Sequence, residues 1–105
     1  FCNVYDAAKG VLKIFKKGKK NEIYNIGNDK EPISIKKLAS KIKKITNNRT
    51  KINFVNYGKS DRKKNRDIFY RSPNIDKAKQ DLSYEPTVKL DEGLKMMLDE
   101  KIRKF

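Results

Sequence analysis

One stretch near the end organises the chain: Arg71-Ser-Pro-Asn-Ile-Asp-Lys-Ala-Lys-Gln-Asp-Leu82, which continues through Ser83-Tyr-Glu-Pro86 to Leu90-Asp-Glu-Gly-Leu94. It predicts a short helix, an aromatic-proline turn and a second helix. Asn74 is placed to cap the short helix. One face of that helix collects the apolar residues Ile75, Ala78 and Leu82.

The last helix is expected to begin near Asp91, after Pro86 has kept the preceding segment extended. Its apolar residues recur at the spacing of a buried stripe: Leu94, Met97, Leu98 and Ile102. The end of the chain is therefore predicted to close a fold rather than to be a free tail.

Three stretches, taken in order, resemble one known family. The first pattern is R-x-P-[DN]-I-x-K-A-x-x-x-L-[GS]-[YWF]-x-P from Arg71 on. Phe1-Cys-Asn-Val-Tyr-Asp-Ala-Ala-Lys-Gly10 is similar to F-x-Y-V-x-D-x-x-x-G, and Glu22-Ile-Tyr-Asn-Ile-Gly-Asn28 to E-x-Y-N-I-G-N/G. Together they resemble the C-terminal end of the NAD-dependent sugar-nucleotide epimerases, dehydratases and decarboxylases, which are extended short-chain dehydrogenases/reductases.

The resemblance implies a fold, a cofactor and partners. Residues 1–105 would be the C-terminal, substrate-binding portion of a longer cytoplasmic enzyme, usually a homodimer, whose N-terminal Rossmann domain holds NAD and the catalytic Tyr/Lys pair. The substrate would be a UDP- or dTDP-linked sugar. The chain itself shows no Gly-x-x-Gly-x-x-Gly turn, so we expect it to bind no NAD and to be inactive alone.

By the same resemblance, the candidate ligands of the substrate's diphosphate are arginines. Guanidinium meets phosphate oxygens in pairs and stays charged when partly buried. Arg71 is the best candidate, with Arg62 and Arg66 as alternates. Asn25 and Gly27 stand where a predicted strand ends, the place where open α/β sheets carry binding residues, although both residues equally suit a turn.

In chain order, helices alternate with short strands, which predicts an α/β fold in one small domain. An amphipathic helix starts near Val4 and ends at the Lys16-Lys-Gly18 turn, and Ser34 caps a second helix that stops at Asn47-Asn48. Short strands are predicted at Glu22–Ile26 and at residues 51–55. Tyr24, Tyr84 and Leu94 are assigned to packing.

Two further features bear on the comparison with this family. Tyr5 and Lys9 have the Tyr-x-x-x-Lys spacing of the family's catalytic pair, but they fall in the Phe1 motif, so we interpret them as surface residues and expect no catalytic residue in the chain. Ser83 replaces a common glycine; if its backbone is left-handed, the replacement costs on the order of 1 kcal/mol.

The charge suggests an alternative function. The 105 residues carry a formal net charge of +14, as a stand-alone module that binds nucleic acid or another polyanion would. However, only five of the 27 basic residues are arginine, and lysine is spread along every predicted helix. Base reading favours arginine, so we do not expect nucleic-acid binding.

Other chemistry is excluded by what the sequence lacks. There is no histidine and only one cysteine, Cys2, so Ser/His or Cys/His nucleophile pairs, most zinc sites and an internal disulfide are ruled out, and no metal is expected. No apolar run approaches the ~18 residues of a membrane span.

Overall fold

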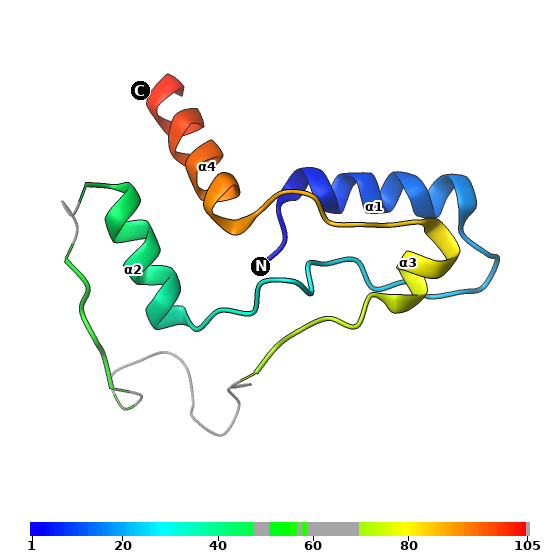
Figure 1. Ribbon diagram of the computed structural model, residues 1–105, viewed down its shortest axis with the longest axis horizontal. Coiled ribbons are helices and arrows are strands. Elements are labelled where there is room, and N and C mark those ends of the chain that lie inside the picture. Colours follow the sequence, from blue (N-terminus) through cyan, green and yellow to red (C-terminus); the bar gives the residue numbers. More distant parts are fainter. Residues whose placement is uncertain (48–50, 57, 59–69, 105) are drawn as a thin grey trace. The chain divides into compact units, whose positions relative to one another are not determined.

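The computed structural model describes residues 1–47, 51–56, 58 and 70–104, with side chains up to Asp99 in the last helix (Figure 1). It contains four helices in the described residues: α1 Val4–Lys17, α2 Ile35–Ile45, α3 Asp76–Leu82 and α4 Leu90–Lys104. The chain divides into two compact units, Phe1–Pro32 with Ser72–Phe105, and Ile33–Arg71. Each unit is described by itself.

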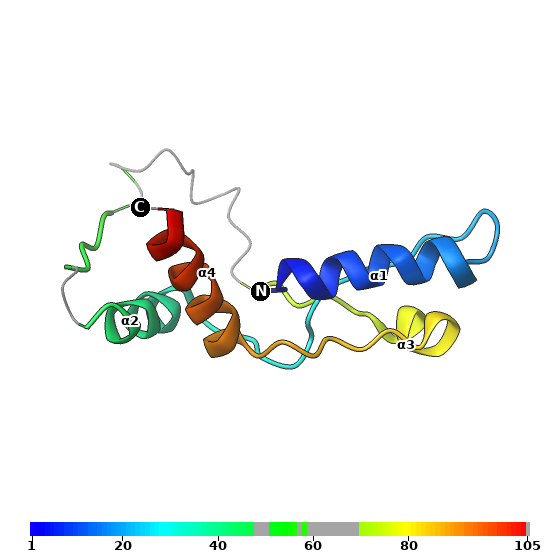
Figure 2. The same ribbon diagram turned by 90° about the horizontal axis from the view of Figure 1, so that it is seen from above.

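The core of the first unit lies on α3. Ile75, Ala78 and Leu82 are buried on one face of this helix, and Tyr84 joins them with 1% of its surface exposed. Ile14, Tyr24 and Ile26 pack against this cluster, and α1 lies alongside α3 (Figures 1 and 2). The face predicted for the short helix, and the packing predicted for Tyr24 and Tyr84, are confirmed.

α1 has two different faces. Its inner face is small or polar: Asp6 and Gly10 are buried, and Gly10 lies so close to Ile26 that a Cβ there would be 2.5 Å from Cγ2 of Ile26. Its outer face is apolar and exposed, with Phe15 at 89%. This outer face consists of Val4, Ala8, Val11, Leu12 and Phe15. The predicted helix is confirmed, but most of the apolar stripe that predicted it is uncovered.

The predicted caps are largely confirmed. Ser34 accepts a hydrogen bond from the N–H of Lys37 at 3.2 Å, and Asn47 ends the turn after α2 with φ of 54°. α3 begins at Asp76 rather than directly after Asn74, yet the Asn74 side chain still accepts from the N–H of Asp76 at 3.0 Å. Asn74 therefore satisfies a backbone N–H in the first turn of α3, as predicted, although it stands one residue before the N-cap position.

Ser83 ends α3 in the left-handed conformation, with φ of 51° and ψ of 39°. Its carbonyl accepts a hydrogen bond from the Nζ of Lys13 at 2.7 Å, which places a cation at the helix C-terminus. Ser83 therefore has the left-handed backbone on which the predicted cost of replacing glycine depends.

Ser83→Gly is expected to raise the free energy of unfolding by about 1 kcal/mol or less, because glycine adopts this conformation without a Cβ clash. Urea denaturation followed by circular dichroism measures the change. Gln80→Gly, at an exposed position inside α3, is the matched control and should lower stability by a similar amount. Destabilisation by both variants would contradict the assignment of strain to Ser83.

The predicted strands are not formed: the described residues of Glu22–Ile26 and of 51–55 contain no strand. A strand exists only through hydrogen bonds to a neighbouring strand, and neither stretch has one among the described residues. The described chain is thus small and mostly helical, and the strand component of the predicted α/β fold is not confirmed.

α4 departs from its predicted stripe at one position. Leu94 and Leu98 are half-buried, but Met97 is 67% exposed, and the side chain of Ile102 lies outside the described residues. At the start of the helix, the N–H of Leu90 donates to Glu31 at 2.8 Å and the N–H of Gly93 donates to the carbonyl of Lys89 at 2.9 Å. Helical spacing predicted α4 correctly, but not the exposure of Met97.

Candidate functional site

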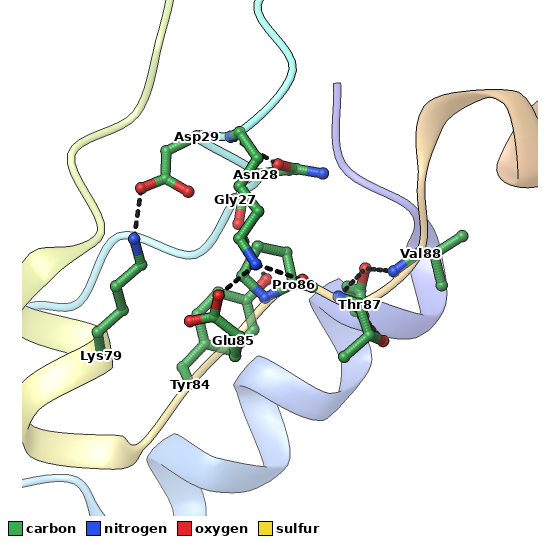
Figure 3. A network of polar contacts seen from close by, with 11 residues as sticks. Gly27, Asn28, Asp29, Lys79, Tyr84, Glu85, Pro86, Thr87 and Val88 are labelled. Atoms are coloured by element: carbon green, nitrogen blue, oxygen red, sulfur yellow. Dashed lines mark hydrogen bonds and ion pairs between the residues drawn. The ribbon is translucent and has the colours of Figure 1, made fainter.

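The loop Asn25–Lys30 is held at several points to segments distant in sequence (Figure 3). At its start, the side-chain amide of Asn25 donates to the carbonyl of Asn74 at 3.4 Å. At its end, Lys30 forms an ion pair with Glu85 and its Nζ lies 3.5 Å from the carbonyl of Pro86. The loop is therefore held both by the segment that precedes α3 and by the segment that follows it.

Tyr84 fixes the middle of this loop. Its hydroxyl donates to the carbonyl of Gly27 at 3.0 Å in a buried hydrogen bond. Burial raises the pKa of Tyr84 well above its usual value, and the neighbouring Cys2, whose Sγ lies 3.9 Å from the hydroxyl, adds to the rise. Tyr84 therefore stays a neutral donor at physiological pH and keeps the Gly27 carbonyl satisfied.

Asp29 and Lys79 form an ion pair between the loop and α3, with 2.6 Å between Oδ2 and Nζ. Their hydrogen bond lowers the pKa of Asp29 and raises that of Lys79. The other carboxylate oxygen of Asp29 is buried without a hydrogen-bond partner among the described residues. Both groups are charged at neutral pH and keep the loop close to α3.

Tyr24, just before the loop, is tied to the far end of α3. Its hydroxyl donates to Oδ2 of Asp81 at 3.1 Å and accepts from the N–H of Lys19 at 3.2 Å. The Lys19 ammonium also bonds Oδ1 of Asp81 at 3.0 Å. These bonds, first that of Lys19 and then that of Tyr24, lower the pKa of Asp81.

Asp6 clamps the segment after Tyr84 to α1, and its side chain is fully buried. It accepts hydrogen bonds from the N–H of Thr87, the hydroxyl of Thr87 and the N–H of Val88, at 2.9–3.1 Å. Burial alone would raise the pKa of Asp6, but the bonds from Val88 and Thr87 more than offset this and lower it. Sequence reasoning gave Asp6 no such role; the available signal was a carboxylate on the same helix face as Gly10.

Relatives of the chain are found among nucleotide-sugar enzymes. It is 35% identical over 97 residues, 92% of its length, to "UDP-glucuronic acid decarboxylase 3" of Arabidopsis thaliana. It is 32% identical over 95 residues, 90% of its length, to "UDP-glucuronate 4-epimerase" of Thermodesulfobacterium geofontis. By sequence, the chain is homologous to the C-terminal part of NAD-dependent sugar-nucleotide epimerases and dehydratases.

The similarity covers only part of each relative. The chain spans 26% of the decarboxylase and 27% of the epimerase, about a quarter of the curated relatives it matches. No protein-family model matches the chain, and no solved structure matches it significantly. The resemblance inferred from the three sequence patterns is confirmed at the level of this epimerase/dehydratase family.

The structure brings two of the predicted site residues together. Asn25 is exposed and Gly27 is buried in the same anchored loop. Arg71 is exposed and belongs to the other unit, and Arg62 and Arg66 lie outside the described residues. The contacts described above therefore concern the Asn25–Lys30 loop. That the three arginines bind a diphosphate remains a prediction from the resemblance to the epimerase/dehydratase family.

Gly27 is not in the conformation expected of a turn glycine, because none of the described glycines has a positive φ. Its requirement is space. A Cβ on Gly27 would lie 2.7 Å from Cγ of Pro73, closer than real Cβ atoms approach any atom. A positive φ, which was one reason for a glycine at this position, is therefore not what Gly27 provides, and close packing against Pro73 accounts for the glycine instead.

The described residues offer side-chain amides, lysines and Arg71 for binding, and hold no group of three or more His, Cys, Asp or Glu side chains that could bind a metal. Tyr5 is 56% exposed and Lys9 is also exposed on α1. Across the described part of the chain, no helix has both the length and the apolar character needed to cross a membrane.

Proposed function

We propose that residues 1–105 form the substrate-binding part of an NAD-dependent nucleotide-sugar epimerase, dehydratase or decarboxylase. The observation that carries the proposal is the similarity to "UDP-glucuronic acid decarboxylase 3" across 92% of the chain. An N-terminal Rossmann domain of the same longer enzyme holds NAD and the catalytic Tyr/Lys pair. Binding energy from the nucleotide diphosphate positions the sugar for hydride transfer.

In this proposal Arg71 binds the diphosphate of a UDP- or dTDP-linked sugar, with Arg62 and Arg66 as further candidates. The exposed guanidinium of Arg71 has five donors in a planar fork, which suits paired phosphate oxygens. Asn25 and Gly27 contribute through the anchored loop, where the exposed Asn25 keeps its side-chain carbonyl oxygen for a ligand.

The exposed apolar residues on the outer face of α1 favour packing against a second domain. The buried hydrophobic residues of the described chain are only Ile75, Ala78, Leu82 and Tyr84, whereas Val4, Val11, Leu12 and Phe15 on the outer face of α1 are each more than half exposed. Each such side chain would gain about 1.5–3 kcal/mol on full burial. We propose that this face packs against the Rossmann domain of the longer enzyme.

The role of Arg71 is tested in the longer enzyme. Arg71→Ala is expected to raise KM for the nucleotide sugar by about 10- to 100-fold, because hydrogen bonds to charged groups contribute about 1.5–3 kcal/mol and each 1.36 kcal/mol is a factor of ten. Arg71→Lys should recover part of this loss, since it keeps the charge without the fork. Steady-state kinetics at fixed ionic strength give both values.

Lys95→Ala, which removes an exposed cation from α4, is the matched control and should leave KM unchanged. An unchanged KM in Arg71→Ala would remove Arg71 from the proposed site. Tight, salt-resistant binding of the chain to heparin together with sequence-preferring nucleic-acid binding would replace the proposal with that of a polyanion-binding module.

A further inference from the structure

Residues 23–26 of the first unit have the two faces of a β-strand. Tyr24 and Ile26 are half-buried and pack against the core cluster on α3, whereas Ile23 is 83% exposed and Asn25 is also exposed. After α1 the chain turns and runs back along this helix (Figure 1). Side chains that alternate between a covered and an open face are the pattern of an extended strand.

The backbone of these four residues makes no hydrogen bond to another backbone group among the residues that the structure describes. The carbonyl of Ile23 instead accepts from the Nζ of Lys77 on α3 at 2.9 Å. In an extended strand the N–H and C=O of one residue point to one edge, and those of the next residue point to the other edge. The edge of Ile23 and Asn25 is therefore turned to α3, and the opposite edge carries the backbone groups of Tyr24 and Ile26.

An edge of this kind accepts an extended segment, because its N–H and C=O groups are a template for a further strand. An added strand also brings side chains beside the exposed Ile23. The chain spans about a quarter of the relatives it matches, so the longer enzyme of the proposed function has ample chain to supply this strand. A second copy of the chain suits the edge less well, because two chains that each carry a formal net charge of +14 repel each other.

We infer that residues 23–26 are a docking edge for a β-strand supplied by the rest of the longer enzyme, which pairs with the backbone of Tyr24 and Ile26. The inference rests on the proposed function, because the partner is a segment of that enzyme. The loop Asn25–Lys30 begins where this strand ends. Pairing therefore fixes the start of the loop, as the hydrogen bond from Tyr84 and the ion pair with α3 fix its later residues.

Amide hydrogen exchange at single-residue resolution in the longer enzyme tests the pairing. After correction for intrinsic rates, the N–H groups of Tyr24 and Ile26 are expected to exchange about 100-fold more slowly than those of Ile23 and Asn25. The reason is that only the first two are hydrogen-bonded to the added strand and need a local opening before they exchange. In the 105-residue chain this alternation should be absent. The comparison within the longer enzyme is decisive by itself, so it does not depend on how the chain behaves alone.

Equal exchange at all four amides, whether fast or slow, would overturn the inference, because even protection means covering without strand pairing. Alternating protection that appears in the 105-residue chain and grows with its concentration would also overturn it, since a second copy would then supply the strand. The proposed function has a different readout. An unchanged KM in Arg71→Ala together with alternating protection would count against the proposed diphosphate site and leave the docking edge in place.

Discussion

Asp6→Ala is expected to lower the free energy of unfolding by about 2–4 kcal/mol. Hydrogen bonds to a charged acceptor are worth about 1.5–3 kcal/mol each and are not additive. Asp6 accepts from two backbone N–H groups and one hydroxyl, and its side chain is fully buried. Its loss leaves the donors of Thr87 and Val88 unpaired and frees the segment after Tyr84 from α1.

Chemical denaturation followed by circular dichroism measures this loss. Asp99→Asn, at an exposed position on α4, is the matched control for removing a carboxylate and should change stability by less than about 0.5 kcal/mol. Equal effects of the two substitutions would show that Asp6 is not a clamp and that the chain responds only to its net charge.

The contribution of Asp6 also has a predicted pH dependence. Its pKa in the folded state is lowered below the value of about 3.9 that an unfolded aspartate has. The stabilisation is therefore fully present above that unfolded value and is lost as pH falls through the folded-state pKa. The difference in stability between the wild type and Asp6→Asn should be constant from pH 7 to 5 and should shrink below pH 4.

The helices could be predicted because their signals are local. Ile75, Ala78 and Leu82 recur within two turns, and the cap at Ser34 needs only the residue three positions on. The left-handed Ser83 was also foreseen as a condition, from the glycine common at that place in the resembling family. Each of these signals lies within a window of a few residues.

The strands and the outer face of α1 depend on partners outside any local window. Alternation at Glu22–Ile26 predicts which residues suit a strand, but the pairing strand must come from elsewhere. Likewise, helical periodicity locates the apolar side of α1 without telling what covers it. The structure buries the opposite side, where Gly10 allows the close approach of Ile26.

The sequence predicted two residues of the candidate site, Asn25 and Gly27, but it did not predict which residues they contact. Asn25 and Gly27 were placed from the end of a predicted strand, whereas their partners Asn74 and Tyr84 are 49 and 57 residues away. The clamp from Asp6 to Thr87 spans 81 residues. Such pairings follow from the fold as a whole, which is why the sequence suggested binding or a turn for Gly27 and gave no sign of its packing against Pro73.

Phe15→Ala is expected to have little effect on the stability of the chain and a large effect on that of the longer enzyme. In the 105-residue chain the side chain is 89% exposed, so its removal should change stability by less than about 0.5 kcal/mol. In the longer enzyme, where we propose that the outer face of α1 packs against the Rossmann domain, the same change should cost about 3–5 kcal/mol. Leu82→Ala, at a fully buried position, should destabilise both proteins by about 2–5 kcal/mol and serves as the control.

A second measurement addresses the same face without depending on a cooperative unfolding transition. In a Cys2→Ser background, the thiol of Phe15→Cys should react with a soluble alkylating reagent at the rate of an exposed cysteine in the chain, and much more slowly in the longer enzyme. A buried thiol is shielded from the reagent, whereas an exposed one is limited only by its thiolate fraction. Fast reaction in both proteins would mean that the outer face of α1 stays in water, and the proposed packing against the Rossmann domain would be wrong.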